Sequence, residues 1–187
     1  GGYYQEDIER IIQIDSILND SNTLVADANT GWKTHEALKV INKTSHLNIY
    51  YEQPCATYND CLLIRKKNNN PFVLDESIFS LESFLRAYQD NAMDIINLKI
   101  SKLGGLTRSK QLRDLCVELK IPMTIEDSWG GDIATAAISH LAHSTPEDYR
   151  FSSTDFNSYN TLSYSIGSPK RKNGKFVASE NYGLGLT

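Results

Sequence analysis

Hydrophobic and polar residues follow two different periods along this chain. Short apolar runs of strand length recur, and the segments between them carry apolar residues at helical spacing. The strands expected from this pattern span residues 23–29, 47–53, 72–76, 94–101, 122–127 and 149–156. The helices expected before and between them span 6–18, 34–43, 58–67, 80–91, 107–120 and 132–143. Regular alternation of strand and helix predicts an α/β fold with a parallel sheet.

The first four expected strands end in charged residues at even intervals. Asp27, Glu52, Asp75 and Lys99 follow one another after 25, 23 and 24 residues. An even repeat of strand, charged strand end and helix is typical of βα units that lie side by side in a parallel barrel. A closed (β/α)8 barrel has eight strands and about 250 residues. Six strands therefore predict a partial TIM-type barrel.

A partial barrel has consequences for both ends of the sequence. We expect residues 1–157 to form the barrel domain and two further βα units to lie upstream. Residues 158–187 are rich in Ser, Gly, Asn and Tyr and are expected to form a partly extended tail. An open array of six strands should also expose sheet edges and apolar helix faces.

Side-chain alternation predicts that the charged residues share one face of their strands. In a barrel strand, alternate side chains point inward and outward toward the helices. When the large aliphatic residues point outward, the inward set is Val25, Asp27, Asn29, Glu52, Asp75, Asn97, Lys99, Thr124 and Glu126. Since barrel enzymes carry their chemistry at the carboxyl ends of the strands, these groups should converge on one mouth.

Converging carboxylates favour a bound cation. Asp27, Glu52 and Asp75 cannot all stay ionised in a dry mouth without one. An all-oxygen ligand set with room for water suits Mg²⁺ better than zinc. Lys99 beside that cation is disfavoured as an ammonium ion and can act as a base. The implied chemistry is abstraction of a proton α to a carboxylate, with Mg²⁺ stabilising the enediolate. Surface carboxylates and a structural ion-pair lysine are the alternative.

Composition narrows the classes of partner. The net charge of −4 and the absence of a basic stripe with interleaved aromatic residues argue against nucleic-acid binding. No apolar run has the length of a membrane span and no secretory signal is visible, so we expect a cytoplasmic protein without a membrane partner. The three cysteines lack metal-site spacing and are expected to be reduced thiols.

Four motifs resemble the enolase superfamily, and within it the muconate lactonizing branch. They are Asp27-Ala-Asn29, Glu52-Gln-Pro54, Asp75-Glu76 and the run from Lys99 to Gly105. The resemblance implies an enolase-like C-terminal barrel domain without its capping domain. It also implies Mg²⁺ bound by the three carboxylates, and Lys99 as one of two bases that flank the substrate.

The motif that carries the second base of that branch is not found in this sequence. It belongs to a Lys-x-Lys motif at the end of the second barrel strand, just before Gly-Gly. This sequence begins at Gly1-Gly2. If these glycines are that loop, the partner lysine and the capping domain lie upstream, which leaves open that the chain alone is inactive.

A finer resemblance involves the runs Asp27–Trp32, Glu52–Cys55, Glu126–Asp132 and Ser153–Asn157. They look like those of cis-3-hydroxy-L-proline dehydratases and hydroxyproline-betaine epimerases. Such enzymes act on small cyclic amino acids, whose cationic nitrogen needs a carboxylate partner. Aromatic rings could add cation–π or wall contacts. The expected substrate contacts are therefore Asn29, Trp32, Glu126, Asp127, Trp129 and Asp155.

Several alternatives stay open. The chain is expected to act as a hydro-lyase on cis-3-hydroxy-L-proline, as an epimerase or racemase of a proline derivative, or as a non-catalytic remnant of the fold. Glu126, Asp127 and Asp155 could instead cap the following helix, and Trp32 and Trp129 could fill the core. Barrels of this family often associate, so a homo-oligomer is expected from the resemblance.

Overall fold

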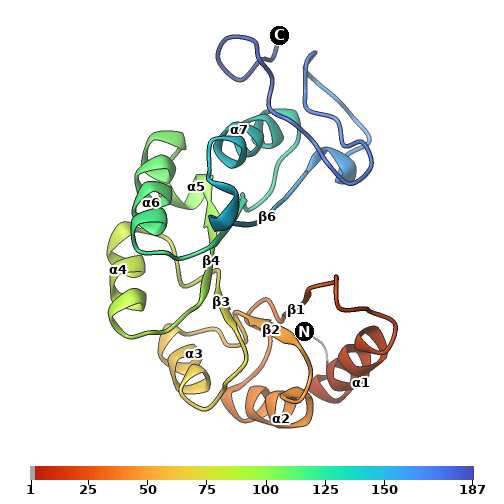
Figure 1. Ribbon diagram of the computed structural model, residues 1–187, viewed down its shortest axis with the longest axis vertical. Helices are drawn as coiled ribbons and strands as arrows, with labels where there is room; N and C mark the ends of the chain where they lie inside the picture. Colours follow the sequence, from red (N-terminus) through yellow and green to blue (C-terminus); the bar gives the residue numbers. More distant parts are fainter. Residues whose placement is uncertain (1–2) are drawn as a thin grey trace. The chain divides into compact units, whose positions relative to one another are not determined.

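The computed structural model describes residues 3–187 as two compact units (Figure 1). The first unit comprises the chain up to Ile78 together with Glu82–Ile95, and the second comprises Phe79–Leu81 together with Ile96–Thr187. All six expected strands and all six expected helices are present, most of them shorter than expected by a few residues. The sequence pattern therefore located the elements correctly.

The first unit contains three parallel strands in sequence order. Its elements are α1 (Tyr4–Asp15), β1 (Leu24–Asp27), α2 (Thr34–Thr44), β2 (Ile49–Glu52), α3 (Tyr58–Arg65), β3 (Phe72–Leu74) and most of α4 (Leu81–Gln89). β2 pairs in parallel with both β1 and β3. This is the arrangement predicted from the alternation of strand and helix.

Alternation along β2 separates the core of the first unit from its strand ends. Ile49 and Tyr51 are fully buried, and the Tyr51 hydroxyl contacts the Thr44 hydroxyl of α2 at 2.7 Å. Other buried residues on this side include Ala37, Val40, Ile41, Ile64, Phe72, Leu74 and Phe84. Each large side chain buried in this way contributes about 1.5–3 kcal/mol to stability. Glu52, on the opposite parity, is left at the strand end.

The second unit repeats the same plan. Its elements are β4 (Ile95–Lys99), α5 (Ile100–Leu103), α6 (Leu106–Glu118), β5 (Met123–Glu126), α7 (Asp132–His143) and β6 (Arg150–Ser153), with short 3-10 helices at Glu147–Tyr149 and Asn157–Tyr159. β5 pairs in parallel with β4 and with β6. The short helix α5, which begins directly after Lys99, was not expected. It ends at Gly104 in the left-handed conformation (φ 87°), where a glycine is least strained.

The tail after residue 157 is held by a buried carboxylate. The Asp132 side chain, at the start of α7, does not cap that helix. It accepts hydrogen bonds from the Tyr164 and Ser165 amides and the Ser163 hydroxyl. Burial alone would raise the pKa of Asp132, but these bonds and the Ser168 hydroxyl lower it. The tail carries one isolated antiparallel bridge, at Lys172 and Lys175, in place of the expected extended pieces.

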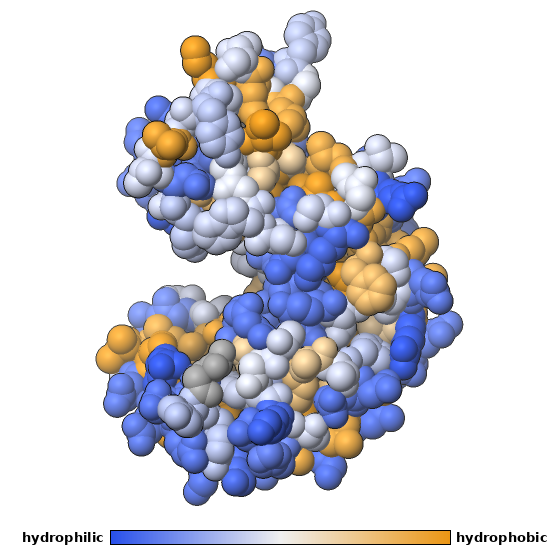
Figure 2. All heavy atoms as spheres, turned by 180° about the vertical axis from the view of Figure 1, so that it is seen from behind, coloured by the Kyte–Doolittle hydropathy of each residue, from blue (hydrophilic) through white to orange (hydrophobic). Residues whose placement is uncertain are grey.

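Hydrophobic side chains also reach the surface of both units (Figure 2). On and just after α1, Ile12, Ile14 and Ile17 are exposed, which confirms the expectation of open apolar helix faces. Within residues 3–187, no helix combines the length and the apolar character that a membrane crossing requires.

Candidate active site

The predicted metal ligands lie at the carboxyl ends of three adjacent strands in the first unit. Asp27, the last residue of β1, is the register partner of Glu52, the last residue of β2. Glu52 is in turn opposite Val73 of β3, so Asp75 follows two residues further along. Both parity and register therefore bring the three carboxylates to the same end of one parallel sheet.

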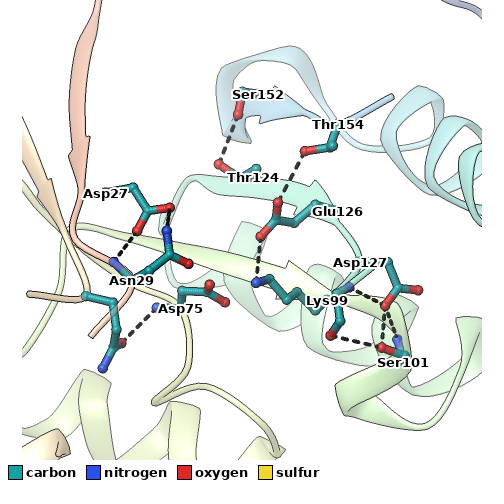
Figure 3. A network of polar contacts seen from close by, with 12 residues as sticks. Asp27, Asn29, Asp75, Lys99, Ser101, Thr124, Glu126, Asp127, Ser152 and Thr154 are labelled. Carbon is teal, nitrogen blue, oxygen red and sulfur yellow. Dashed lines mark hydrogen bonds and ion pairs between the residues drawn. The ribbon is translucent and has the colours of Figure 1, made fainter. Parts of the chain in front are cut away.

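Asn29 holds the carboxylate of Asp27. The Asn29 backbone amide donates to Asp27 Oδ1 at 2.8 Å, and the Asn29 side-chain amide donates to Oδ2 at 2.7 Å (Figure 3). The turn that allows this has left-handed φ angles of 46° at Asn29 and 63° at Thr30. Asn29, expected to contact substrate, is here a partner of a predicted metal ligand.

The oxygen donors of Asp27, Glu52 and Asp75 suit Mg²⁺, although these side chains do not converge on one metal position in the structure. In the part of the chain that the structure describes, no three His, Cys, Asp or Glu side chains lie close enough to share a metal ion. All three predicted ligands offer carboxylate oxygens, which Mg²⁺ prefers. Each oxygen of Asp27 also keeps a second lone pair beyond its bond to Asn29. The predicted ligands therefore fit the ion in donor type and in their common position at the strand ends.

Sequence reasoning missed Gln53. It is fully buried, and its side-chain carbonyl accepts a hydrogen bond from the backbone amide of Asp75 at 3.1 Å. The signal in the sequence is a glutamine between a charged strand end and Pro54. A polar side chain at the end of a buried strand must find hydrogen-bond partners.

The second unit brings Lys99 and Glu126 together. They are register partners at the ends of β4 and β5, and Lys99 Nζ lies 3.4 Å from Glu126 Oε1 (Figure 3). The Thr154 hydroxyl donates to Glu126 Oε2 at 3.2 Å. The Lys99 and Glu126 side chains are only 14% and 15% exposed, so solvent screens the pair weakly.

Asp127 hydrogen-bonds to the segment that follows Lys99. Its Oδ1 accepts hydrogen bonds from the Ser101 amide at 3.1 Å, from the Ser101 hydroxyl, and from the Ser128 amide at 2.7 Å (Figure 3). Ser101 belongs to α5, two residues after Lys99. Asp127 therefore ties the end of β5 to the start of α5 and does not cap the next helix, which was the alternative.

Asp155 faces the tail. Its Oδ1 accepts from the Asn157 amide at 2.9 Å, and its Oδ2 lies 3.7 Å from Arg171 Nε. With Arg171 and other tail residues it lines a pocket of about 360 Å³. The preceding residue, Thr154, contacts Glu126 instead. One residue beyond Thr154, the Asp155 carboxylate therefore lies toward the tail, and its contact with substrate stays a prediction.

The two tryptophans differ sharply. Trp32 is 4% exposed, and its indole N–H donates to Asp7 at 2.8 Å, so the structure favours core packing for it over substrate contact. Trp129 is 67% exposed and packs edgewise against Phe156 and Tyr159, with ring centroids 5.8 Å and 6.1 Å away. Its ring is available to a ligand.

The cysteines are free and buried, as expected. A hydrogen bond to the Cys55 thiol, together with burial, raises the pKa of Cys61, and burial raises the pKa of Cys116 to about 12. The hydrogen bond from Cys61 lowers the pKa of Cys55. The Cys61 and Cys116 thiols are therefore neutral at pH 7 and do not supply thiolate ligands.

Parallel βα units, with carboxylates at three strand ends of the first unit and a lysine at a strand end of the second, are the features of an α/β barrel domain. The chain belongs to the enolase C-terminal domain-like family, whose model matches residues 1–187. The predicted fold class, a partial TIM-type barrel of the enolase kind, is thereby confirmed, as is the predicted membership of an enzyme superfamily.

Relatives add detail to that family. The chain is 54% identical over all 187 residues to a cis-3-hydroxy-L-proline dehydratase from Roseibium aggregatum, of which it covers 51%. It is 30% identical over 148 residues to an L-Ala-D/L-Glu epimerase from Francisella tularensis, covering 74% of this chain and 41% of that protein. A crystal structure of an enolase superfamily member from Roseovarius nubinhibens complexed with magnesium superposes with a TM-score of 0.94 at 31% identity, covering 100% of this chain and 51% of that one. The chain thus spans about half the length of the relatives it matches.

Proposed function

We propose that this chain supplies the metal ligands and one base of a Mg²⁺-dependent hydro-lyase that dehydrates cis-3-hydroxy-L-proline. The observation that carries the proposal is the sequence of strand ends: carboxylates on three successive strands of one unit, and Lys99 paired with Glu126 in the other. The 54% identity to a dehydratase of that substrate, over the whole chain, supports the choice of reaction.

The first unit provides the ligands. Asp27, Glu52 and Asp75 would hold Mg²⁺, with the Asn29 amide orienting Asp27. When bound, the ion stabilises negative charge that develops on the substrate carboxylate as the α-proton leaves. The magnesium-bound relative of known structure supports this assignment.

The second unit provides the base. Lys99 removes the α-proton only as a neutral amine, and Glu126 at 3.4 Å favours its charged form before substrate binds. The cationic ring nitrogen of a proline substrate would compete for Glu126 and release the Lys99 amine from its partner. The α-proton then passes to Lys99 Nζ. The C3–O bond breaks, and the 3-hydroxyl takes this proton back from the Lys99 ammonium and leaves as water. The resulting enamine, with its double bond between Cα and C3, becomes the cyclic imine when a proton moves from its nitrogen to C3.

Other groups have supporting roles. Asp127 fixes the start of α5 beside Lys99, and the exposed Trp129 ring can form one wall for the substrate ring or face its charge. We propose a cytoplasmic location for the enzyme, and no nucleic-acid or membrane partner, on the grounds of its charge and composition.

An epimerase of a proline derivative is the second candidate, favoured by the identity to an amino-acid epimerase relative. It would use the same ligands and Lys99 but return a proton from the opposite face. The two reactions share their first step and diverge only afterwards.

Proton NMR in D₂O, on the full-length protein with Mg²⁺ and cis-3-hydroxy-L-proline, distinguishes them. The proposal predicts loss of substrate to a cyclic imine. Exchange of the α-proton without elimination would favour the epimerase. No exchange with any proline derivative would contradict both activities and favour the non-catalytic remnant.

A further inference from the structure

Gln53 connects all three strand ends of the first unit. It follows Glu52 directly and has a left-handed φ of 32°, which is unusual for a residue other than glycine. Its backbone amide donates to the Val73 carbonyl at 3.0 Å, and its own carbonyl accepts from the Thr30 amide at 2.9 Å. The backbone of Gln53 therefore links the loop after β1 to the end of β3.

The side chain of Gln53 adds a second set of bonds on the same side. Oε1 accepts from the backbone amides of Asp75 at 3.1 Å and Ser77 at 3.2 Å. Nε2 donates to the Ser77 hydroxyl at 2.9 Å and to the Cys55 carbonyl at 3.1 Å, and lies 3.4 Å from Cys61 Sγ. Because backbone amides can only donate, the orientation of the Gln53 amide is fixed by its neighbours.

These bonds have no substitute in the buried site. Gln53 is fully buried and Asp75 is only 2% exposed, so water does not reach the Asp75 amide in place of Oε1. A buried donor left without a partner is costly, and the turn after β3 would move to satisfy it. The Gln53 side chain therefore fixes the turn that carries Asp75, beyond the backbone bond that joins Gln53 to Val73.

We infer that Gln53 is a positioning residue that sets the spacing of the predicted metal ligands, although it coordinates nothing itself. The inference rests on the proposed function, because it assumes that Asp75 and Glu52 bind Mg²⁺. It goes further in assigning the geometry of that ligand set to a neutral amide.

No other side chain meets the same requirements at this position. Asparagine is one methylene shorter and would not reach Asp75 and Ser77 together. Glutamate keeps the acceptor but has no N–H groups for Ser77 and Cys55 and adds a charge beside two predicted ligands. Methionine matches the volume and lacks both donor and acceptor, which makes Gln53→Met the sharpest test.

Thr44→Val is a matched control in the same unit. Thr44 is fully buried and hydrogen-bonds the Tyr51 hydroxyl at 2.7 Å and the Val40 carbonyl at 2.8 Å. The valine variant loses buried hydrogen bonds on the helix-facing side of β2, away from the strand ends. Its effect on folding should resemble that of Gln53→Met, whereas its effect on metal binding should not.

The measurement is Mn²⁺ affinity of the full-length protein by electron paramagnetic resonance, with thermal melting of each variant. We expect Gln53→Met to weaken Mn²⁺ binding by about 10- to 100-fold, the usual effect of losing a partner that orients ligands. Thr44→Val should leave the affinity within about twofold, since the Tyr51 side chain points to the face of β2 opposite to that of Glu52. Parental affinity in a folded Gln53→Met protein would overturn the inference.

A milder variant keeps the test decisive if Gln53→Met does not fold. Ser77→Ala removes one acceptor of the Gln53 amide and leaves both bonds to Oε1. It should weaken Mn²⁺ binding by about two- to tenfold, the value of one neutral hydrogen bond, and unchanged affinity would overturn the inference. An unsubstituted protein that binds no Mn²⁺, or an Asp75→Asn variant with full affinity, would overturn the proposed function instead.

Discussion

The strand ends of the two units are held in different ways. In the first unit the contacts come from neutral amides. Asn29 donates hydrogen bonds to the Asp27 carboxylate, and the side chain of Gln53 accepts one from the backbone amide of Asp75. In the second, ionised groups pair with each other, since Lys99 meets Glu126 and Asp127 fastens the start of α5. A set of like charges awaiting a cation is best oriented by uncharged donors, whereas a lysine beside a carboxylate is held in place as an ion pair until a cationic substrate competes for that carboxylate. We therefore expect substitutions in the first unit to weaken metal binding, and substitutions in the second unit to slow proton transfer without weakening metal binding.

The largest expected effect comes from removing the base. Lys99→Ala should lower the rate of α-proton exchange by about 10²- to 10⁴-fold, the usual contribution of a general base. The rate is measured by proton NMR in D₂O with cis-3-hydroxy-L-proline. A variant that retains the parental rate would show that Lys99 is only a structural ion-pair partner.

Glu126→Gln sharpens the contrast between charged and neutral contacts. Glutamine keeps an oxygen for the Thr154 hydroxyl but removes the charge that faces Lys99. In the proposed function the Glu126 carboxylate also binds the cationic ring nitrogen of the substrate. A hydrogen bond to a charged group is worth about 1.5–3 kcal/mol, so loss of this contact should lower kcat/KM by about 10- to 100-fold. Steady-state kinetics check this, with Thr154→Val as the smaller control. Equal effects of the two variants would contradict a role for the charge.

The hydrogen bonds between the Asp132 carboxylate and the tail provide a test of an ionised contact outside the candidate active site. Asp132→Asn should lower the free energy of unfolding by about 2 kcal/mol, since the carboxylate accepts hydrogen bonds from the tail. Because folding lowers the pKa of Asp132, this stability is fully present above its ordinary pKa of about 4 and is lost as the pH falls through the folded value. Urea unfolding from pH 7 to pH 2.5 measures it.

The gap between Asp132→Asn and the unsubstituted protein should stay constant down to about pH 4 and narrow below it. The tail should also become sensitive to proteases at neutral pH in the variant. A gap that widens in acid would mean that the carboxylate is destabilising in the fold.

The smallest expected effect distinguishes the two tryptophans. Trp129→Ala should raise KM by about two- to tenfold with little change in melting temperature, because the ring is exposed. Trp32→Phe should show the reverse, since it removes the bond to Asp7 in the core. The two variants are compared by kinetics and thermal melting. A rise in KM for Trp32→Phe alone would exchange the roles assigned to them.

Sequence periodicity was sufficient for the six strands, the helices between them except α5, and the order of charged strand ends, because successive side chains of a strand point to opposite faces. The same alternation correctly placed Thr124 and Glu126 on one face, where they contact Ser152, Thr154 and Lys99. It made no prediction beyond the strand ends, where Asp127 hydrogen-bonds to Ser101 of α5 and Asp155 lies near Arg171 of the tail. There the backbone leaves the extended conformation, and local hydrogen bonds decide where a side chain points.

Hydrogen bonds between buried polar groups were the other feature that the sequence did not predict. Gln53 and the Asp7 partner of Trp32 are separated in sequence from the groups they bind, and periodicity carries no information about such pairs. The metal-ligand and base assignments themselves rest on sequence parity, register and family membership, and they remain predictions until binding is measured.

The most direct test of the division between the units is Mn²⁺ binding to Lys99→Ala and Asp27→Asn, measured side by side with α-proton exchange. We expect Lys99→Ala to bind Mn²⁺ with parental affinity and to exchange the α-proton about 10²- to 10⁴-fold more slowly, whereas Asp27→Asn should lose both Mn²⁺ binding and exchange. If Lys99→Ala abolished Mn²⁺ binding, or Asp27→Asn retained it, the assignment of ligands to one unit and the base to the other would be wrong.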